Sequence, residues 1–212
     1  MNEKITYIII GLNCIISFVG FSDKNFFEKY LYRPYNVHKN GSEWYRIFTG
    51  TFLHANMPHL FFNMWALYLF GALLEHYEFP LYFHDKANFY YILLYVGGIM
   101  FSALPTFEKY KNTYSYAAVG ASGAVSAVVF SFILINPAAP LSFVFIPFIN
   151  FSAWIFGGLY LLYSWYMSRH GHDNIGHDAH LWGALYGIAF TIAIHPHFAV
   201  SFFYKIFPQY AS

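Results

Sequence analysis

The sequence predicts an all-α membrane protein: a bundle of six transmembrane helices with a partly embedded first loop, in a single domain covering residues 1–212. Of the 212 residues, 58% are hydrophobic and only 10% are charged, and the mean hydropathy is positive. That balance lies outside the usual range of soluble globular domains. A chain of this length has room for about six spans of roughly 20 residues joined by short loops.

The expected helices cover about residues 5–22, 47–74, 89–104, 117–135, 141–167 and 179–194. The first apolar run could be a signal peptide, because Lys4 precedes it, but no convincing small-residue cleavage site follows, and we expect it to remain a helix. The segment 22–44 mixes charged and aromatic residues, which indicates an interfacial loop. The aromatic tail 200–210 suits the lipid headgroup zone. Glu75, His76 and Glu78 are expected to be solvated at the opposite surface.

The fourth span contains a serine that is expected to lie below the membrane surface. From Ser122 to Ile135, where Asn136-Pro137 ends the helix, the span has 14 residues. At a rise of ~1.5 Å per residue these cover about 21 Å of a hydrocarbon layer of roughly 30 Å. Gly120 and Gly123 permit a tight backbone turn, and the free N–H groups of a helix start favour negative charge. The alternative is a packing face of small residues.

The sixth span contains a histidine on a glycine-lined face. His180, Gly183 and Gly187 fall at i, i+3 and i+7, so they share one side of a helix that another backbone can approach closely. If the approaching helix is the fourth span, the imidazole of His180 can take the proton of the Ser122 hydroxyl. Asp178, two residues earlier, points to another side, and Asp173 lies in the preceding loop. We therefore predict a Ser-His dyad.

The second span supplies polar groups near its start. His59 and Asn63 are one helical turn apart on one face, where their donors fit an oxyanion hole for a tetrahedral intermediate. His54 precedes them. The alternative places both histidines at the membrane interface and uses Asn63 to hold helices together.

These residues fall into four motifs whose order along the chain resembles that of the rhomboid intramembrane serine proteases, from the first loop to the sixth helix. The motifs are Trp44-Tyr45-Arg46, His54-x4-His59-x3-Asn63, Gly120-x-Ser122-Gly123 and Ala179-His180-x2-Gly183-x3-Gly187.

The resemblance implies roles for these residues. Ser122 would be the nucleophile and His180 the general base, while His59, Asn63 and the Ser122 backbone N–H would form the oxyanion hole. Arg46 would brace the first loop, and Phe62 is a candidate gate residue because it precedes Asn63.

The resemblance also implies a single-chain enzyme without cofactor or metal, set among membrane lipids. Its substrates would be transmembrane helices of other proteins, cut after a small residue near the external membrane face. The expected location is the bacterial cell (inner) membrane, with the active site opening to the external side.

Two features depart from the family pattern. Many rhomboids have Tyr or Phe four residues after the nucleophile, stacked on the catalytic histidine, whereas this chain has Ser126. The family topology would also place three basic residues in cytoplasmic segments and eight in external ones, which opposes the positive-inside rule.

Two other functions fit parts of the sequence. The eleven histidines, among them His54, His59, His170, His172, His177, His180, His195 and His197, could ligate metal in a membrane metalloenzyme or transporter. Their spacing, however, lacks a His-x2-His-His or His-Glu-x2-His element. A catalytically inactive rhomboid relative that binds membrane clients is the other alternative, and the presence of both Ser122 and His180 disfavours it.

The net charge of +1 disfavours a nucleic-acid partner. The single Cys14 cannot form a disulfide within the chain.

Overall fold

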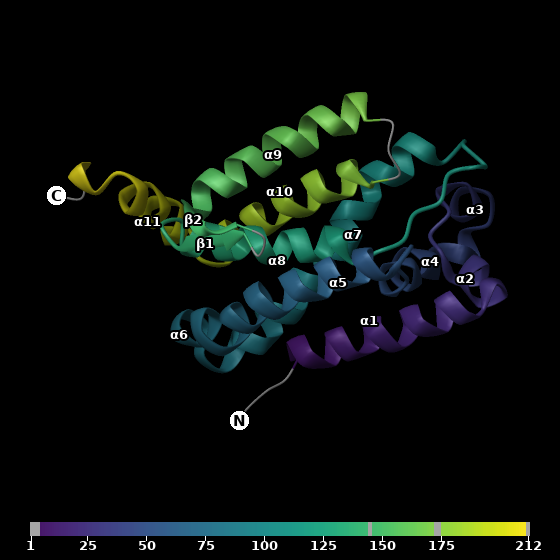
Figure 1. The fold of residues 1–212 in the computed structure, drawn as a ribbon, viewed down its shortest axis with the longest axis horizontal. Coiled ribbons are helices and arrows are strands. Elements are labelled where there is room, and N and C mark those ends of the chain that lie inside the picture. Colours follow the sequence, from purple (N-terminus) through teal and green to yellow (C-terminus); the bar gives the residue numbers. More distant parts are fainter. Residues whose placement is uncertain (1–4, 144–145, 172–174, 211–212) are drawn as a thin grey trace.

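The computed structural model describes residues 5–143, 146–171 and 175–210. It is mainly helical, and its long helices lie beside one another along the longest axis (Figure 1). The α-helices are α1 (Ile5–Ser22), α2 (Lys24–Tyr30), α3 (Pro34–Lys39), α4 (Arg46–Thr49), α5 (Met57–Ala66), α6 (Phe79–Phe83), α7 (Ala87–Tyr110), α8 (Ser122–Ile135), α9 (Ala153–His170), α10 (His177–Ile194) and α11 (His197–Ile206). The strands are β1 (Pro140–Phe143) and β2 (Ile146–Ser152).

Shorter helical segments join these elements. The 3-10 segments are η1 (Gly41–Tyr45), η2 (Gly50–Phe52), η5 (His84–Lys86) and η6 (Pro208–Tyr210), and the π-helical segments η3 (Leu67–Gly71) and η4 (Leu74–Glu78) continue α5 toward α6. The second long helix begins at Met57 rather than near residue 47, because Asn56 caps it by accepting a hydrogen bond from the His59 N–H. The residues before it form α4 and η2.

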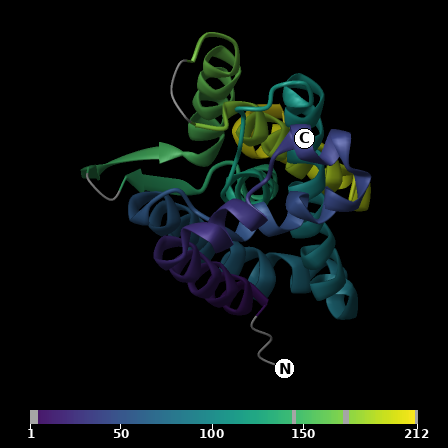
Figure 2. The same cartoon turned by 90° about the vertical axis from the view of Figure 1, so that its right-hand side faces the viewer.

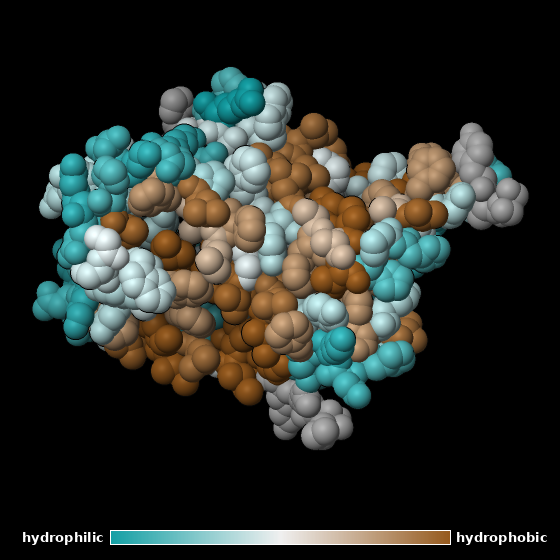
Figure 3. Space-filling view, turned by 180° about the vertical axis from the view of Figure 1, so that it is seen from behind, coloured by the Kyte–Doolittle hydropathy of each residue, from teal (hydrophilic) through white to brown (hydrophobic). Residues whose placement is uncertain are grey.

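Two helical stretches among the described residues are long and apolar enough to cross a membrane, Ile5–Ser22 and Met57–Tyr110. Helices α10 and α11 are bent by 113° relative to each other, and they would make a third span if they form one broken span. Helix α8 is apolar but shorter. The expected number of six spans therefore stays a prediction. The surface in Figure 3 is apolar across its middle and hydrophilic toward both ends, as a lipid-facing band requires.

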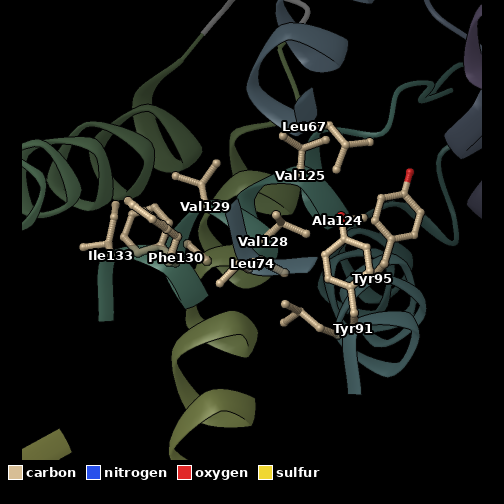
Figure 4. Packing of buried hydrophobic residues seen from close by; sticks show 14 of the residues in the cluster. Leu67, Leu74, Tyr91, Tyr95, Ala124, Val125, Val128, Val129, Phe130 and Ile133 are labelled. Atoms are coloured by element: carbon tan, nitrogen blue, oxygen red, sulfur yellow. The ribbon is translucent and has the colours of Figure 1, made fainter. Parts of the chain in front are cut away.

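Helix α8 lies at the centre of the bundle. Viewed along the helices, it is surrounded by the other long elements (Figure 2), and every residue from Gly123 to Ile135 is buried. Leu67 and Leu74 of the second helix, together with Tyr91 of α7, pack around the Val128 side of α8 (Figure 4). A helix enclosed on all sides has no solvent-facing side, which explains why its polar residues are limited to Ser122, Ser126 and Ser131.

Helices α8 and α10 are in backbone contact because of two glycines. A Cβ at Gly183 would overlap the Gly123 carbonyl group, and a Cβ at Gly187 would overlap the carbonyl oxygen of Ala127. Glycine is thus required at both positions for this approach. The contact begins one residue after Ser122 and one turn after His180.

The expected fifth helix over residues 141–167 is wrong in its first part. Pro140–Phe143 and Ile146–Ser152 pair as the antiparallel hairpin β1–β2, with Pro140 paired to Ser152 and Leu141 to Phe151, and α9 begins only at Ala153. Pro147 disfavours a helix interior, because it has no backbone N–H, and the aromatic and β-branched residues around it favour strands. The hairpin projects away from the helices (Figure 2).

Glu75 is buried, contrary to the expectation of a solvated position. Its carboxylate accepts hydrogen bonds from the backbone N–H groups of Ile5 (2.6 Å) and Thr6 (2.8 Å) at the start of α1. These are the first N–H groups of the helix in the part of the chain that the structure describes, and a negative charge at a helix start is favourable. Glu75 therefore fastens α1 to the second helix.

Candidate active site

Ser122 is the first residue of α8, so this helix begins later than the expected start near residue 117. The chain reaches it through Gly120, whose φ of +118° is a conformation that side chains disfavour. A Cβ on Gly120 would also lie 2.6 Å from Cε1 of His59. The Gly120 N–H donates to the Gly50 carbonyl oxygen at 3.0 Å, and Ala118 pairs with Tyr32. The turn before Ser122 is thus fixed to the first loop on one side and to His59 on the other.

His180 lies in the second turn of α10, at the same end of the bundle as Ser122. Its backbone N–H donates to the Gly176 carbonyl oxygen at 3.1 Å. The packing of Gly183 on Gly123 brings these two helix starts together. The serine and the histidine therefore come from adjacent helices, which the glycine spacing predicts.

A single cavity of 1270 Å³ is lined by most of the predicted site residues. Ser122 and His180 line it together with His59 and Asn63 of α5. Among its lining are also Phe62, Gly120, Gly123 and Ser126. Gly183 and Gly187 instead serve the contact between α8 and α10.

Asn63 is buried and faces this cavity from α5. Its side-chain NH₂ donates to the carbonyl oxygen of His59 at 2.9 Å, one turn earlier. An amide nitrogen has two hydrogens, so one remains for another acceptor. The hydrogen bond to His59 fixes where the second hydrogen points.

His54 is buried behind His59 rather than in the cavity wall. The two imidazole rings are 5.1 Å apart at 70°, and Nδ1 of His54 is 2.8 Å from the Ser17 hydroxyl of α1. His54 therefore connects α1 to the His59 side of the cavity.

Arg46 lies outside the cavity, in the first loop. Its guanidinium donates to the carbonyl oxygens of Leu31 (3.0 Å) and Glu28 (3.3 Å) and forms an ion pair with Glu43. Burial disfavours ionisation of Glu43, but hydrogen bonds from Arg46 and Asn36 outweigh it and lower the pKa of Glu43. The charged pair joins α2, η1 and α4 into one unit.

The position four residues after Ser122 is occupied differently from the family pattern. The Ser126 hydroxyl is 2.8 Å from the hydroxyl of Tyr160, which belongs to α9. The Tyr160 ring in turn stacks on the His180 imidazole, with centroids 6.1 Å apart and planes at 27°. Tyr160 could not be identified from the sequence, because no local pattern tells which residue of one helix meets a ring on another.

Part of the cavity lining is formed by an ion pair between Lys109 and Asp178. Lys109 of α7 donates to the Asp178 carboxylate (2.7 Å) and to the carbonyl oxygen of Ser168 (3.0 Å). Asp178 thus binds Lys109, and Asp173 lies outside the described residues. Nearby, burial raises the pKa of Tyr116, so its hydroxyl stays neutral.

The described histidines do not form the cluster that a metal site needs. Over residues 5–143, 146–171 and 175–210, no three His, Cys, Asp or Glu side chains are grouped to hold a metal ion. His54 contacts His59, His177 contacts His180, and His195 contacts His197. His172 lies outside the described residues.

The fold and cavity define a helical membrane protein with polar groups enclosed among apolar helices. The Rhomboid domain family matches residues 41–197, which is most of the chain, and the protein therefore belongs to the rhomboid family. This is a family of membrane proteins that are typically intramembrane serine proteases.

Two curated relatives agree with this membership. The chain is 34% identical over 91 residues to "Putative rhomboid protease YdcA" of Bacillus subtilis (strain 168), covering 43% of this chain and 41% of that protein. It is 33% identical over 119 residues to "Rhomboid-like protein 11, chloroplastic" of Arabidopsis thaliana, covering 56% of this chain and 36% of that protein. The matched segments thus span about two fifths of the length of these relatives.

Proposed function

We propose that this protein is an intramembrane serine endopeptidase that uses Ser122 as nucleophile and His180 as general base. The observation that carries the proposal is the shared cavity, which Ser122 lines from α8, His180 from α10, and His59 and Asn63 from α5. These side chains supply a nucleophile, a base and hydrogen-bond donors, the three functions that acyl transfer requires.

In the acylation step, the Ser122 hydroxyl oxygen forms a bond to the carbonyl carbon of the substrate while His180 takes the hydroxyl proton. The tetrahedral intermediate then breaks its C–N bond, and His180 gives the proton to the leaving amine. The amino-terminal product stays attached to Ser122 as an ester.

In the deacylation step, His180 takes a proton from a water molecule as that water attacks the ester carbon. Breakage of the bond to the Ser122 oxygen releases a carboxylic acid, and His180 returns the proton to Ser122. The cavity is the place where this water is held, because water does not reach a lipid-facing surface.

The negative charge that develops on the carbonyl oxygen is stabilised by Asn63, His59 and the backbone N–H of Ser122. The Ser122 N–H belongs to the first turn of α8, where N–H groups have no acceptor within the helix. The second hydrogen of the Asn63 amide adds a neutral donor. Donors fixed before the reaction stabilise the transition state without reorganisation.

The substrates proposed are transmembrane segments of other membrane proteins, cut after a small residue. Such a segment reaches the cavity from the lipid, and its backbone must leave the helical form before its carbonyl groups can meet Ser122. Phe62 is exposed next to Asn63 and also lines the cavity, which suits a gate for that entry.

The decisive experiment uses purified protein in lipid vesicles with a model transmembrane substrate. Ser122→Ala and His180→Ala are expected to abolish cleavage, and Ser122→Ala is expected to abolish labelling by a fluorophosphonate. Matched controls are Ser22→Ala and His197→Ala, which change exposed residues outside the cavity. Continued cleavage by the Ser122→Ala variant would refute the proposal, and absence of labelling in the unaltered protein would favour an inactive client-binding relative.

We also propose that the protein lies in a bacterial cell (inner) membrane with the α2–α4 end facing outward. The chain's only cysteine is Cys14, so a Cys14→Ser background allows single cysteines to be placed at exposed Ser42 near the site and at exposed Asp85 at the other end. A membrane-impermeant maleimide applied to intact cells should label Ser42→Cys and spare Asp85→Cys. The reverse pattern would show the opposite orientation, which the count of basic residues favours.

A further inference from the structure

Tyr160 lies where it can fix the plane of the His180 ring. The two rings are nearly parallel, at 27°, with centroids 6.1 Å apart. Both side chains line the same cavity. Tyr160 comes from α9, whereas the serine that occupies the family's aromatic position, Ser126, comes from α8.

The position of Tyr160 is itself fixed from two sides. Its hydroxyl is 2.8 Å from the Ser126 hydroxyl, which is buried. Its ring contacts Phe130 of α8 at 5.5 Å and Phe156 of α9 at 6.1 Å between centroids. A small side chain at position 126 therefore leaves room for the tyrosine and also supplies its hydrogen-bond partner.

We propose that Tyr160, held by Ser126, is the positioning residue that orients His180 for proton transfer in this protein. The inference rests on the proposed function. In the family pattern the aromatic ring lies four residues after the nucleophile, whereas here α9 supplies it. Ser126, which occupies the family's aromatic position, holds the Tyr160 hydroxyl by a hydrogen bond.

The physical reasons are orientation and charge. A general base works only if its nitrogen is held within hydrogen-bond reach of the proton it takes, and a nearly parallel, offset aromatic neighbour restricts rotation of the imidazole. When His180 takes the Ser122 proton it becomes a cation whose ring centre is 6.1 Å from that of Tyr160, at the outer limit of cation–π attraction. The Asp178 carboxylate, by contrast, is bound to Lys109.

The activity test compares variants that remove the ring or only its anchor. Tyr160→Leu is expected to lower kcat on the order of 10-fold or more with KM nearly unchanged, because orientation is lost while substrate contacts remain. Tyr160→Phe and Ser126→Ala both remove only the hydrogen bond, so each should lower kcat a few-fold, and the double variant should be no worse than either. Tyr166→Leu on the same helix, at an exposed position outside the cavity, is the matched control.

A ring exchange separates positioning from general packing. The variant that combines Tyr160→Leu with Ser126→Phe returns an aromatic ring to the α8 position and is expected to recover a large part of kcat. A purely structural role of Tyr160 predicts no recovery, because the α9 side of the cavity stays altered.

A spectroscopic test does not depend on cleavage. In protein labelled with ¹³C-histidine, the His180 Cε1–H resonance, assigned with His180→Asn, should carry a ring-current shift that Tyr160→Leu removes and Tyr166→Leu does not. Equal kcat in Tyr160→Leu and Tyr166→Leu, or an unmoved His180 resonance, would overturn the positioning role while leaving the proposed function intact. If the unaltered protein neither cleaves nor is labelled at Ser122, both proposals fail.

Discussion

A methyl group added at Gly183 should separate the two helices that carry the proposed dyad. The new Cβ would lie 2.8 Å from the carbonyl carbon of Gly123 and 3.0 Å from its Cα. Carbon atoms prefer separations of about 3.5–4.0 Å, so the backbones must move apart by about 0.7–1.2 Å. Because the obstacle is backbone inside a closed bundle, a change of side-chain rotamer cannot relieve it.

The displacement occurs beside the reacting groups. Gly123 follows Ser122 directly, and Gly183 is one turn from His180, so most of the movement is transmitted to the distance between hydroxyl and imidazole. A misplacement of about 1 Å can cost on the order of 100-fold in rate. We expect Gly183→Ala to lower kcat by roughly that factor and to destabilise the fold by about 1–3 kcal/mol through overpacking.

The assay measures kcat on a transmembrane substrate and the thermal unfolding midpoint in detergent micelles. The control is Gly158→Ala in α9, where an added Cβ meets nothing within 4 Å. Both variants gain the same helix propensity, about 1 kcal/mol in water, so their difference isolates the contact with Gly123. If Gly183→Ala matches Gly158→Ala in both measurements, the close approach of α8 and α10 does not set the geometry of the site.

Three further predictions concern single polar groups. Asn63→Ala should slow cleavage on the order of 10-fold to 1,000-fold with unchanged folding, as loss of one oxyanion donor does, and an unaltered rate would remove Asn63 from the site. Glu75→Ala removes the acceptor of the Ile5 and Thr6 N–H groups at the start of α1. The thermal unfolding midpoint of this variant should therefore fall further than that of Glu78→Ala. Equal falls in the two variants would contradict the role of Glu75 in fastening α1. The pKa of Glu43 is lowered in the folded protein, so its pair with Arg46 stabilises the first loop above the usual glutamate pKa, and this contribution is lost as pH falls through the lowered value. Limited proteolysis should therefore show Glu43→Gln to be more sensitive than the unaltered protein at pH 7 and the two to converge in acid; a difference that persists in acid would contradict it.

Those parts of the fold that depend on local sequence were predictable. The end of α8 follows from Asn136-Pro137, which acts on the nearest turn of backbone. The glycines around Ser122 favour the turn that precedes the helix, although the apolar run itself begins near residue 117. The face formed by His180, Gly183 and Gly187 follows from helical spacing. The approach of this face to α8 was a reasonable inference because glycine pairs favour close helix packing.

Features that depend on contacts between distant segments were not predictable. The apolar run after Pro140 has no clear period, so a strand and a buried helix could not be told apart there. Glu75 looked like a surface residue because its partners, the N–H groups of Ile5 and Thr6, are about 70 positions away in the sequence. Tyr160 was missed for the same reason.

The origin of the stacked ring has a consequence for the order of events during turnover. Because Tyr160 belongs to α9, any outward displacement of that helix that admits a substrate from the lipid would break the bond to Ser126 and withdraw the ring from His180. Hydrolysis would then have to wait until α9 returns to its resting place. In the proposed mechanism, Ser122 could therefore not attack a substrate while α9 is displaced, and only a substrate that lets α9 return would be cut.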